Sequence, residues 1–285
     1  MAHITFRGER IDIGGRCLRV MRAGPTSGGP LVVCEHGAFG CAADWAVVQD
    51  RLTARGLRSL AYDRAGLGYS DTGPEPRDGR AINDDLEALL KALGEAGPIL
   101  LVGHSMGGLM VRLFALERDL PLVGLVLVDT VTPDVLSLPG GRPVIHAFGR
   151  LLQVVSHGAR VGLMHPVSLV SGNLIGLPGE PGAEKRRIHA SATHAHGAAA
   201  EVMSWPATSK LAGAADLSPE LPVAVVTAGP ARSGGRLKAI QEAPAKRARS
   251  GYVEHVTAAN HANLLGPRFA DAILRGVDHV LSAKV

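Results

Sequence analysis

Apolar residues along this chain alternate between short continuous runs and stretches with helical spacing. The strand-like runs are 3–7, 10–14, 17–23, 30–37, 57–63, 99–102 and 122–129. The first three are short and separated by glycine turns, which predicts a β-meander, and the later ones are nearly all apolar, as in strands buried on both faces. Helical patterns follow at 45–55, at 81–93 and after residue 107. This alternation predicts a mostly parallel, doubly wound α/β sheet with helices on both faces.

The strand pattern stops between residues 130 and 219. Helix-like stretches at 144–155 and 186–203 lie there between glycine- and proline-rich pieces. Strands then return at 221–229 and 251–258, and an amphipathic helix closes the chain within 261–281. We therefore expect a core of residues 1–129 and 220–285, with a helical lid at 130–219 inserted over the sheet.

The segment Gly103-His104-Ser105-Met106-Gly107 separates a buried strand from a helix. A turn this sharp strains its central residue and leaves room only for small neighbours, which the two glycines provide. The Ser105 hydroxyl would then be exposed at the tip of the turn, as a nucleophile must be. A serine between glycines can also be a simple helix cap, so the assignment needs a base and an acid nearby.

His261 is the best candidate for the base. It lies in the turn after the last predicted strand and before the closing helix, at the same carboxyl edge of the sheet as Ser105. A serine hydroxyl becomes nucleophilic when such a histidine accepts its proton. The amides of Met106, at the start of the next helix, and of Ala38, in the loop after 30–37, are expected to form an oxyanion hole.

Four segments together resemble the α/β-hydrolase fold family, in its serine-nucleophile, carboxylesterase- and lipase-like branch. They are "HGAFG" at 36–40, "YDRAGLGYSD" at 62–71, "GHSMGG" at 103–108 and "NHANLL" at 260–265. The resemblance covers nearly the whole chain. It implies an eight-stranded, mostly parallel sheet, a helical lid between strands six and seven, and action on carbonyl substrates without a metal or organic cofactor.

The third catalytic group departs from the most common pattern of that family. Its members usually carry the acid in a turn after strand seven, but this chain has "VVTAGPARSGG" there, with no carboxylate before Glu242. Asp129 ends the strand 122–129 at the correct edge of the sheet, so we predict it as the acid. Asp134 and Glu242 are the alternatives.

Composition limits the other classes of function. With 46% hydrophobic and 20% charged residues and a net charge of +4, the chain is typical of a globular protein, and its basic clusters have no nucleic-acid motif around them. Three cysteines without metal or disulfide spacing, and no apolar leader or membrane-spanning run, favour a cytoplasmic protein. His189, His194 and His196 do not share a helical face, so no metal site is predicted. The sequence does not indicate an oligomeric state.

These features predict a serine hydrolase for a small ester-like substrate, acting through an acyl-enzyme on Ser105. Lactone, thioester, aminoacyl-peptide and carbon–carbon bond hydrolysis remain alternatives, as does a ligand receptor on the same scaffold. Six apolar residues of the expected lid could either line an acyl pocket or pack the lid itself. They are Phe148, Leu151, Leu152, Met164, Met203 and Trp205.

Overall fold

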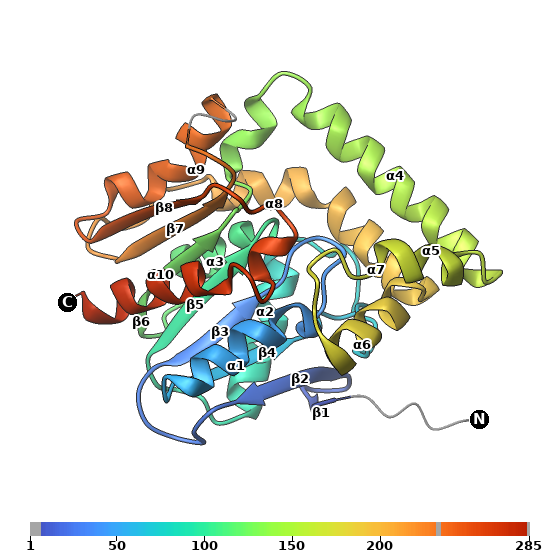
Figure 1. The fold of residues 1–285 in the computed structure, drawn as a ribbon, viewed down its shortest axis with the longest axis horizontal. Helices are drawn as coiled ribbons and strands as arrows, with labels where there is room; N and C mark the ends of the chain where they lie inside the picture. Colours follow the sequence, from blue (N-terminus) through green and yellow to red (C-terminus); the bar gives the residue numbers. More distant parts are fainter. Residues whose placement is uncertain (1–6, 232–234, 284–285) are drawn as a thin grey trace.

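The computed structural model describes residues 7–231 and 235–283, and a sheet of eight strands runs through its centre (Figure 1). The predicted strand at 3–7 lies outside these residues, apart from Arg7. The strands are β1 (Glu9–Asp12), β2 (Cys17–Ala23), β3 (Leu31–Glu35), β4 (Arg58–Tyr62), β5 (Ile99–His104), β6 (Leu122–Val128), β7 (Val223–Ala228) and β8 (Gly251–Val256).

The order across the sheet is β1-β2-β4-β3-β5-β6-β7-β8. Antiparallel pairing joins β1 to β2 and β2 to β4, and every other neighbouring pair is parallel. The predicted fold class, a mostly parallel eight-stranded sheet covered by helices, is therefore confirmed.

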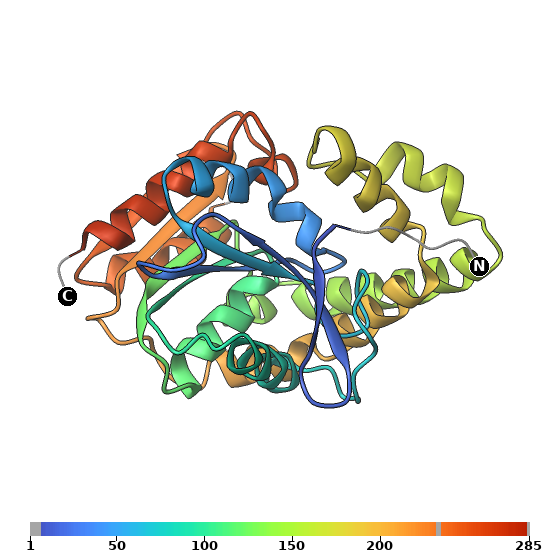
Figure 2. The same ribbon diagram turned by 90° about the horizontal axis from the view of Figure 1, so that it is seen from below.

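Alternate residues of the central strands fill two separate cores. On β5, Leu100 and Val102 face one side, where they pack with α1 (Ala46–Ala54) and α10 (Ala270–Ser282). Leu101 faces the other side, towards α2 (Gly79–Ala92), α3 (Gly107–Glu117) and α9 (Arg236–Arg247). Figure 2 shows these two helical layers on opposite faces of the sheet. Because both faces are covered, the strands are apolar almost throughout.

Five helices lie between β6 and β7, where two stretches of helix were predicted. They are α4 (Gly141–Arg160), α5 (Met164–Ser171), α6 (Gly179–His189), α7 (Ala192–Met203) and α8 (Trp205–Ala212). A third apolar core joins α4, α7 and α8 to the outer side of α3. The bounds of the predicted lid at 130 and 219 remain a prediction.

The predicted single helix at 186–203 is wrong in one respect, because the chain breaks it into α6 and α7. Ser191 has extended backbone and its hydroxyl accepts the amide proton of His194, so it starts a new helix as an N-cap. Helices α5, α8 and α9 were not predicted. In the part of the chain that the structure describes, no helix is long and apolar enough to span a membrane.

We expect Phe114→Ala to lower the free energy of unfolding by about 3–5 kcal/mol, because Phe114 is fully buried where α3 meets the sheet. Denaturant unfolding would measure the loss. Leu237→Ala is the control, since Leu237 is exposed and the change should stay within about 0.5 kcal/mol. Equal, small losses in both variants would contradict the packing described here.

Candidate active site

The turn between β5 and α3 holds Ser105 in a strained conformation. Its φ of 54° lies in the left-handed region, which costs a non-glycine residue roughly 1–3 kcal/mol. The turn also lies very close to its neighbours: a Cβ on Gly107 would be 2.5 Å from the carbonyl oxygen of Glu35, and one on Gly103 would be 2.8 Å from that of Gly107. Glycine is required at both positions, and the serine side chain is left half-buried at the tip.

Ser105, His261 and Asp129 lie in one hydrogen-bonded line. His261 follows β8, just before the short helix η3 (Asn263–Leu265), and its Nε2 is 3.0 Å from the Ser105 hydroxyl. Its Nδ1 is 2.6 Å from Oδ2 of Asp129, the residue that follows β6. With the proton on Nδ1, the imidazole donates to the carboxylate and accepts from the serine. Of the three predicted acids, Asp129 is the one that contacts His261.

The other oxygen of Asp129 is also held. Oδ1 accepts the Ala228 amide at 3.2 Å and the side-chain amide of Gln241, on α9, at 3.4 Å. Burial alone would raise the pKa of Asp129, but the hydrogen bond and charge interaction with His261, together with the Ala228 amide, lower it below its ordinary value. The carboxylate is therefore ionised at neutral pH. Gln241 was not predicted, because its contact crosses from α9 to the end of β6.

The two alternative acids have other surroundings. Glu242 forms an ion pair with Lys246 at 2.5 Å, and its other oxygen lies 3.3 Å from Nε2 of His255. Asp134 lies in the short helix η2 (Pro133–Ser137), where its carbonyl accepts the Ser137 hydroxyl. In the part of the chain that the structure describes, neither carboxylate contacts His261.

His104 holds the loop that carries His261. Its Nε2 is 3.0 Å from the carbonyl oxygen of His261, and the two rings lie 4.7 Å apart. Burial and the neighbouring His261 lower the pKa of His104 to about 3. His104 is therefore neutral, and its Nε2–H donates to the His261 carbonyl. This residue was not singled out by the sequence.

Ala38 and Met106, the residues predicted for the oxyanion hole, lie in the loop after β3 and directly after Ser105. Met106 is the N-cap of α3, and Ala38 follows Gly37, where a Cβ would be 2.9 Å from the Cβ of Ser105. Within residues 7–231 and 235–283, neither amide donates to another protein group. Both N–H groups therefore remain available to an oxygen placed beside Ser105.

Arg64 fixes the loop that carries Ala38. Its guanidinium donates to the carbonyl oxygens of His36, at 2.6 Å, and Gly37, at 3.0 Å. It also forms buried ion pairs with Glu35, at the end of β3, and with Glu201, on α7. Burial would lower the pKa of Arg64, but the two carboxylates outweigh it and raise that pKa above its ordinary value. Arg64 therefore has a structural role in holding this loop.

A cavity of about 220 Å³ opens beside Ser105. One wall is apolar, and its side chains are Phe39, Phe148, Leu174 and Ile175. The opposite wall contains a buried ion pair between Lys185, on α6, and Asp44, in the short helix η1 (Ala42–Trp45). Burial would lower the pKa of Lys185, but Asp44 outweighs it and raises that pKa.

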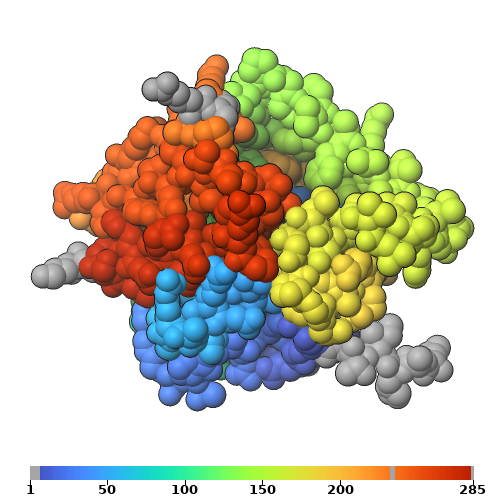
Figure 3. All heavy atoms as spheres, viewed as in Figure 1, coloured from blue at the N-terminus to red at the C-terminus, as the bar shows by residue number. Residues whose placement is uncertain are grey.

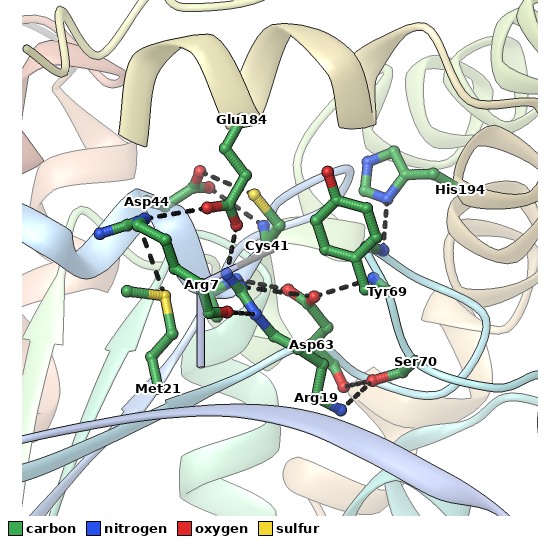
Figure 4. A network of polar contacts seen from close by, with 12 residues as sticks. Arg7, Arg19, Met21, Cys41, Asp44, Asp63, Tyr69, Ser70, Glu184 and His194 are labelled. Atoms are coloured by element: carbon green, nitrogen blue, oxygen red, sulfur yellow. Dashed lines mark hydrogen bonds and ion pairs between the residues drawn. The ribbon is translucent and has the colours of Figure 1, made fainter. Parts of the chain in front are cut away.

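A network of polar contacts fastens α6 onto the core next to this cavity (Figure 4). Glu184, from α6, pairs with Arg19 and, at 3.0 Å, with Arg7. Asp63 accepts the amides of Ala42, at 2.7 Å, and Tyr69, at 2.9 Å. The segment 62–71 therefore connects the sheet with the helices above it.

Of the six apolar residues considered for an acyl pocket, Phe148 lines the cavity. Leu152 and Trp205 are buried in the third core, and Leu151 and Met203 are exposed. The rings of His189 and His194 lie 6.2 Å apart, and each contacts the ring of Phe39. In the described residues, no group of three histidine, cysteine or acidic side chains could hold a metal ion.

Comparisons with known proteins identify the fold. Residues 30–143 match the family model of the alpha/beta hydrolase fold. Over 114 residues the chain is 37% identical to an sn-1-specific diacylglycerol lipase of Mus musculus, a match that covers 40% of this chain and 36% of that protein. Over 128 residues it is 36% identical to a probable transporter of Hormonema carpetanum, covering 43% and 18%. The chain thus spans little more than a third of the one relative and less than a fifth of the other.

Two solved structures resemble the chain over nearly its full length. A thermophilic esterase from Thermogutta terrifontis has a TM-score of 0.68 and 24% identity, with 96% of this chain and 99% of that chain covered. A putative epoxide hydrolase from Pseudomonas aeruginosa has a TM-score of 0.74 and 17% identity, with 96% of each chain covered. At these identities the likeness concerns the fold alone.

Buried neutral histidines around the site predict acid sensitivity. Burial lowers the pKa of His104 and of His194 to about 3, and it also lowers that of His36, so the unfolded chain binds more protons below pH 6.5. The contribution of these histidines to the free energy of unfolding should be fully present above this pH. Below it, the free energy of unfolding should fall by about 1.4 kcal/mol per pH unit for each histidine.

Unfolding of the native protein and of His194→Gln over about pH 4 to 6 tests this linkage. The glutamine amide can still donate to the Phe39 carbonyl and accept from the Gly68 amide, as His194 does. The slope of stability against pH should be shallower in the variant by about 1.4 kcal/mol per unit. Equal slopes would show that His194 does not drive acid unfolding.

Proposed function

We propose that this chain is an α/β-hydrolase that hydrolyses carboxylic esters through an acyl-enzyme on Ser105. The observation that carries the proposal is the continuous hydrogen-bonded line from Asp129 through His261 to the Ser105 hydroxyl, with distances of 2.6 and 3.0 Å. A small molecule can reach this hydroxyl, because the cavity of about 220 Å³ opens onto it.

In the first half of the reaction, Nε2 of His261 accepts the hydroxyl proton while Oγ attacks the ester carbonyl. Ionised Asp129 stabilises the imidazolium and keeps Nδ1 protonated. The amides of Ala38 and Met106 donate to the developing oxyanion, and each such donor typically contributes about 3 kcal/mol. His261 then protonates the departing alkoxide, and the acyl group stays on Ser105.

In the second half, a water molecule replaces the alcohol. His261 accepts a proton from the water, hydroxide adds to the acyl carbon, and the protonated imidazole returns the proton to Oγ as the carboxylic acid leaves. The cycle restores Ser105 and needs no metal or organic cofactor. The substrate proposed is a small ester, since the cavity is smaller than those that enclose drug-sized ligands.

Epoxide opening fits the site less well than ester hydrolysis. Attack of Ser105 on an epoxide would give an ether, which the same site could not hydrolyse, so the enzyme would turn over once. Hydrolysis of lactones, thioesters, aminoacyl-peptides and carbon–carbon bonds next to a carbonyl would also proceed through an acyl-enzyme on Ser105, so these reactions remain alternatives. A receptor would bind an ester without needing the ordered triad. Turnover therefore separates the two classes, because many product molecules per protein molecule support an enzyme.

We expect a fluorophosphonate probe to label the native protein and to leave Ser105→Ala unlabelled, because the probe reacts with an activated serine. Turnover of short-chain nitrophenyl esters should fall by about five to six orders of magnitude in the same variant. Ser171→Ala is the matched control: Ser171 lines the same cavity but donates its hydroxyl proton to the Val167 carbonyl. Labelling that survives in Ser105→Ala would reject the nucleophile.

We expect Asp129→Asn to keep the fold and to lower kcat by about 10⁴, because an amide favours the wrong imidazole tautomer. Steady-state ester hydrolysis measures kcat, and circular dichroism checks the fold. Asp134→Asn and Glu242→Gln should each retain activity within a few-fold. A large loss of activity in either of these two variants, with activity preserved in Asp129→Asn, would assign the role of the acid to that other residue.

A further inference from the structure

The outer surface of α4 and α5 is apolar to a degree found nowhere else on the described chain. Of the eleven large apolar side chains that are exposed in residues 7–231 and 235–283, nine lie between residues 144 and 174, with exposed fractions of 46% to 87%. They are Val144, Leu151, Val154, Val161, Leu163, Val167, Leu169, Val170 and Leu174. We call these nine residues the α4–α5 surface.

The spacing on α4 places its members on one face. Val144, Leu151, Val154 and Val161 follow one another at intervals of seven, three and seven residues, which is one stripe of a helix. A second stripe, with Ile145 and Leu152, is buried against α7 in the third core. The exposed stripe is therefore not the side that holds α4 in place. Contiguous exposed apolar surface of this kind marks an interaction site.

The charge around this surface has one sign. Between Asp134 and Glu180 the chain has no acidic residue, and its three charged side chains are Arg142, Arg150 and Arg160. All three are exposed, and in the described part of the chain none of them has a carboxylate within ion-pair distance. The segment therefore carries a formal charge of +3, and Arg150 flanks the exposed apolar stripe on α4.

The surface also reaches the candidate active site. Leu174, which is 65% exposed, lines the cavity beside Ser105. In the space-filling view the molecule is hollowed between the red C-terminal segment, the green α4 and the yellow segment that follows α5 (Figure 3). A partner that covers this surface would therefore also contact the opening of the cavity at Leu174.

We infer that the α4–α5 surface docks on an anionic phospholipid bilayer. Valine and leucine side chains next to unpaired arginines match an interface whose acyl region is apolar and whose headgroups are negative. A second copy of the chain fits less well, because a two-fold contact would bring the same arginines together and would cover the cavity mouth at Leu174. Docking by the α4–α5 surface brings the opening of the cavity to the bilayer surface, where apolar esters concentrate.

Co-sedimentation of the full-length protein with vesicles tests the inference. We expect binding to phosphatidylcholine vesicles that contain phosphatidylglycerol, and at least tenfold weaker binding to pure phosphatidylcholine or at high salt. Leu151→Ser with Val154→Ser and Val170→Ser, and separately Arg142→Gln with Arg150→Gln and Arg160→Gln, should each lower the binding at least tenfold. Leu237→Ser and Arg236→Gln, which change exposed residues of α9, are the matched controls and should bind as the native protein does.

Hydrolysis of a water-soluble ester separates this inference from the proposed function. The surface variants should keep native turnover, since none of them lines the cavity, so loss of vesicle binding with full activity supports docking. Vesicle binding that is absent in the native protein, or equal in the surface and control variants, would overturn it. So would a native dimer in sedimentation equilibrium that the serine variants convert to a monomer, because the surface would then be an interface between copies.

Discussion

The guanidinium of Arg64 is fully buried where three parts of the chain meet. Its acceptors are Glu35 at the end of β3, the carbonyls of His36 and Gly37 in the next loop, and Glu201 on α7. A buried cation is tolerated only when such partners are all in place, and removing one partner of a buried pair typically costs about 3–5 kcal/mol. The sheet, the loop with Ala38 and the helices above it are thereby held in one arrangement.

The sheet was predictable from the sequence because burial on both faces leaves a simple signal. Residues 122–128 are almost all apolar and form β6, and 99–104 form β5. The helices outside the sheet were harder to predict. Helix α9 has few apolar residues and contains Pro244, and α8 is only eight residues long. Their stability comes from packing on β7, β8 and α3, which local spacing does not encode.

The three residues of the candidate triad could be predicted because each ends a strand or follows one. Ser105 and Asp129 leave neighbouring parallel strands, and His261 follows the last strand, so the sheet brings them to one edge. The residues that hold them in place gave no such signal. Gln241 is 112 positions from Asp129, and His104 contacts His261 over 157 positions, so only the folded chain brings them together.

Positive φ values connect this edge of the sheet with its reactivity. Among the described residues other than glycine, Phe39, Ser105 and Asp129 have φ between 45° and 56°. Phe39 lines the cavity, Ser105 carries the hydroxyl and Asp129 carries the carboxylate. The backbone strain is therefore concentrated at the candidate site. The family match at 30–143 includes all three but neither His261 nor α5 to α7. Ser105 and Asp129 therefore lie within the segment that matches the family model, whereas Lys185 and Leu174, which line the cavity, lie outside it. Substitutions at these two positions can change which small molecule enters the cavity while leaving the line from Asp129 to Ser105 intact.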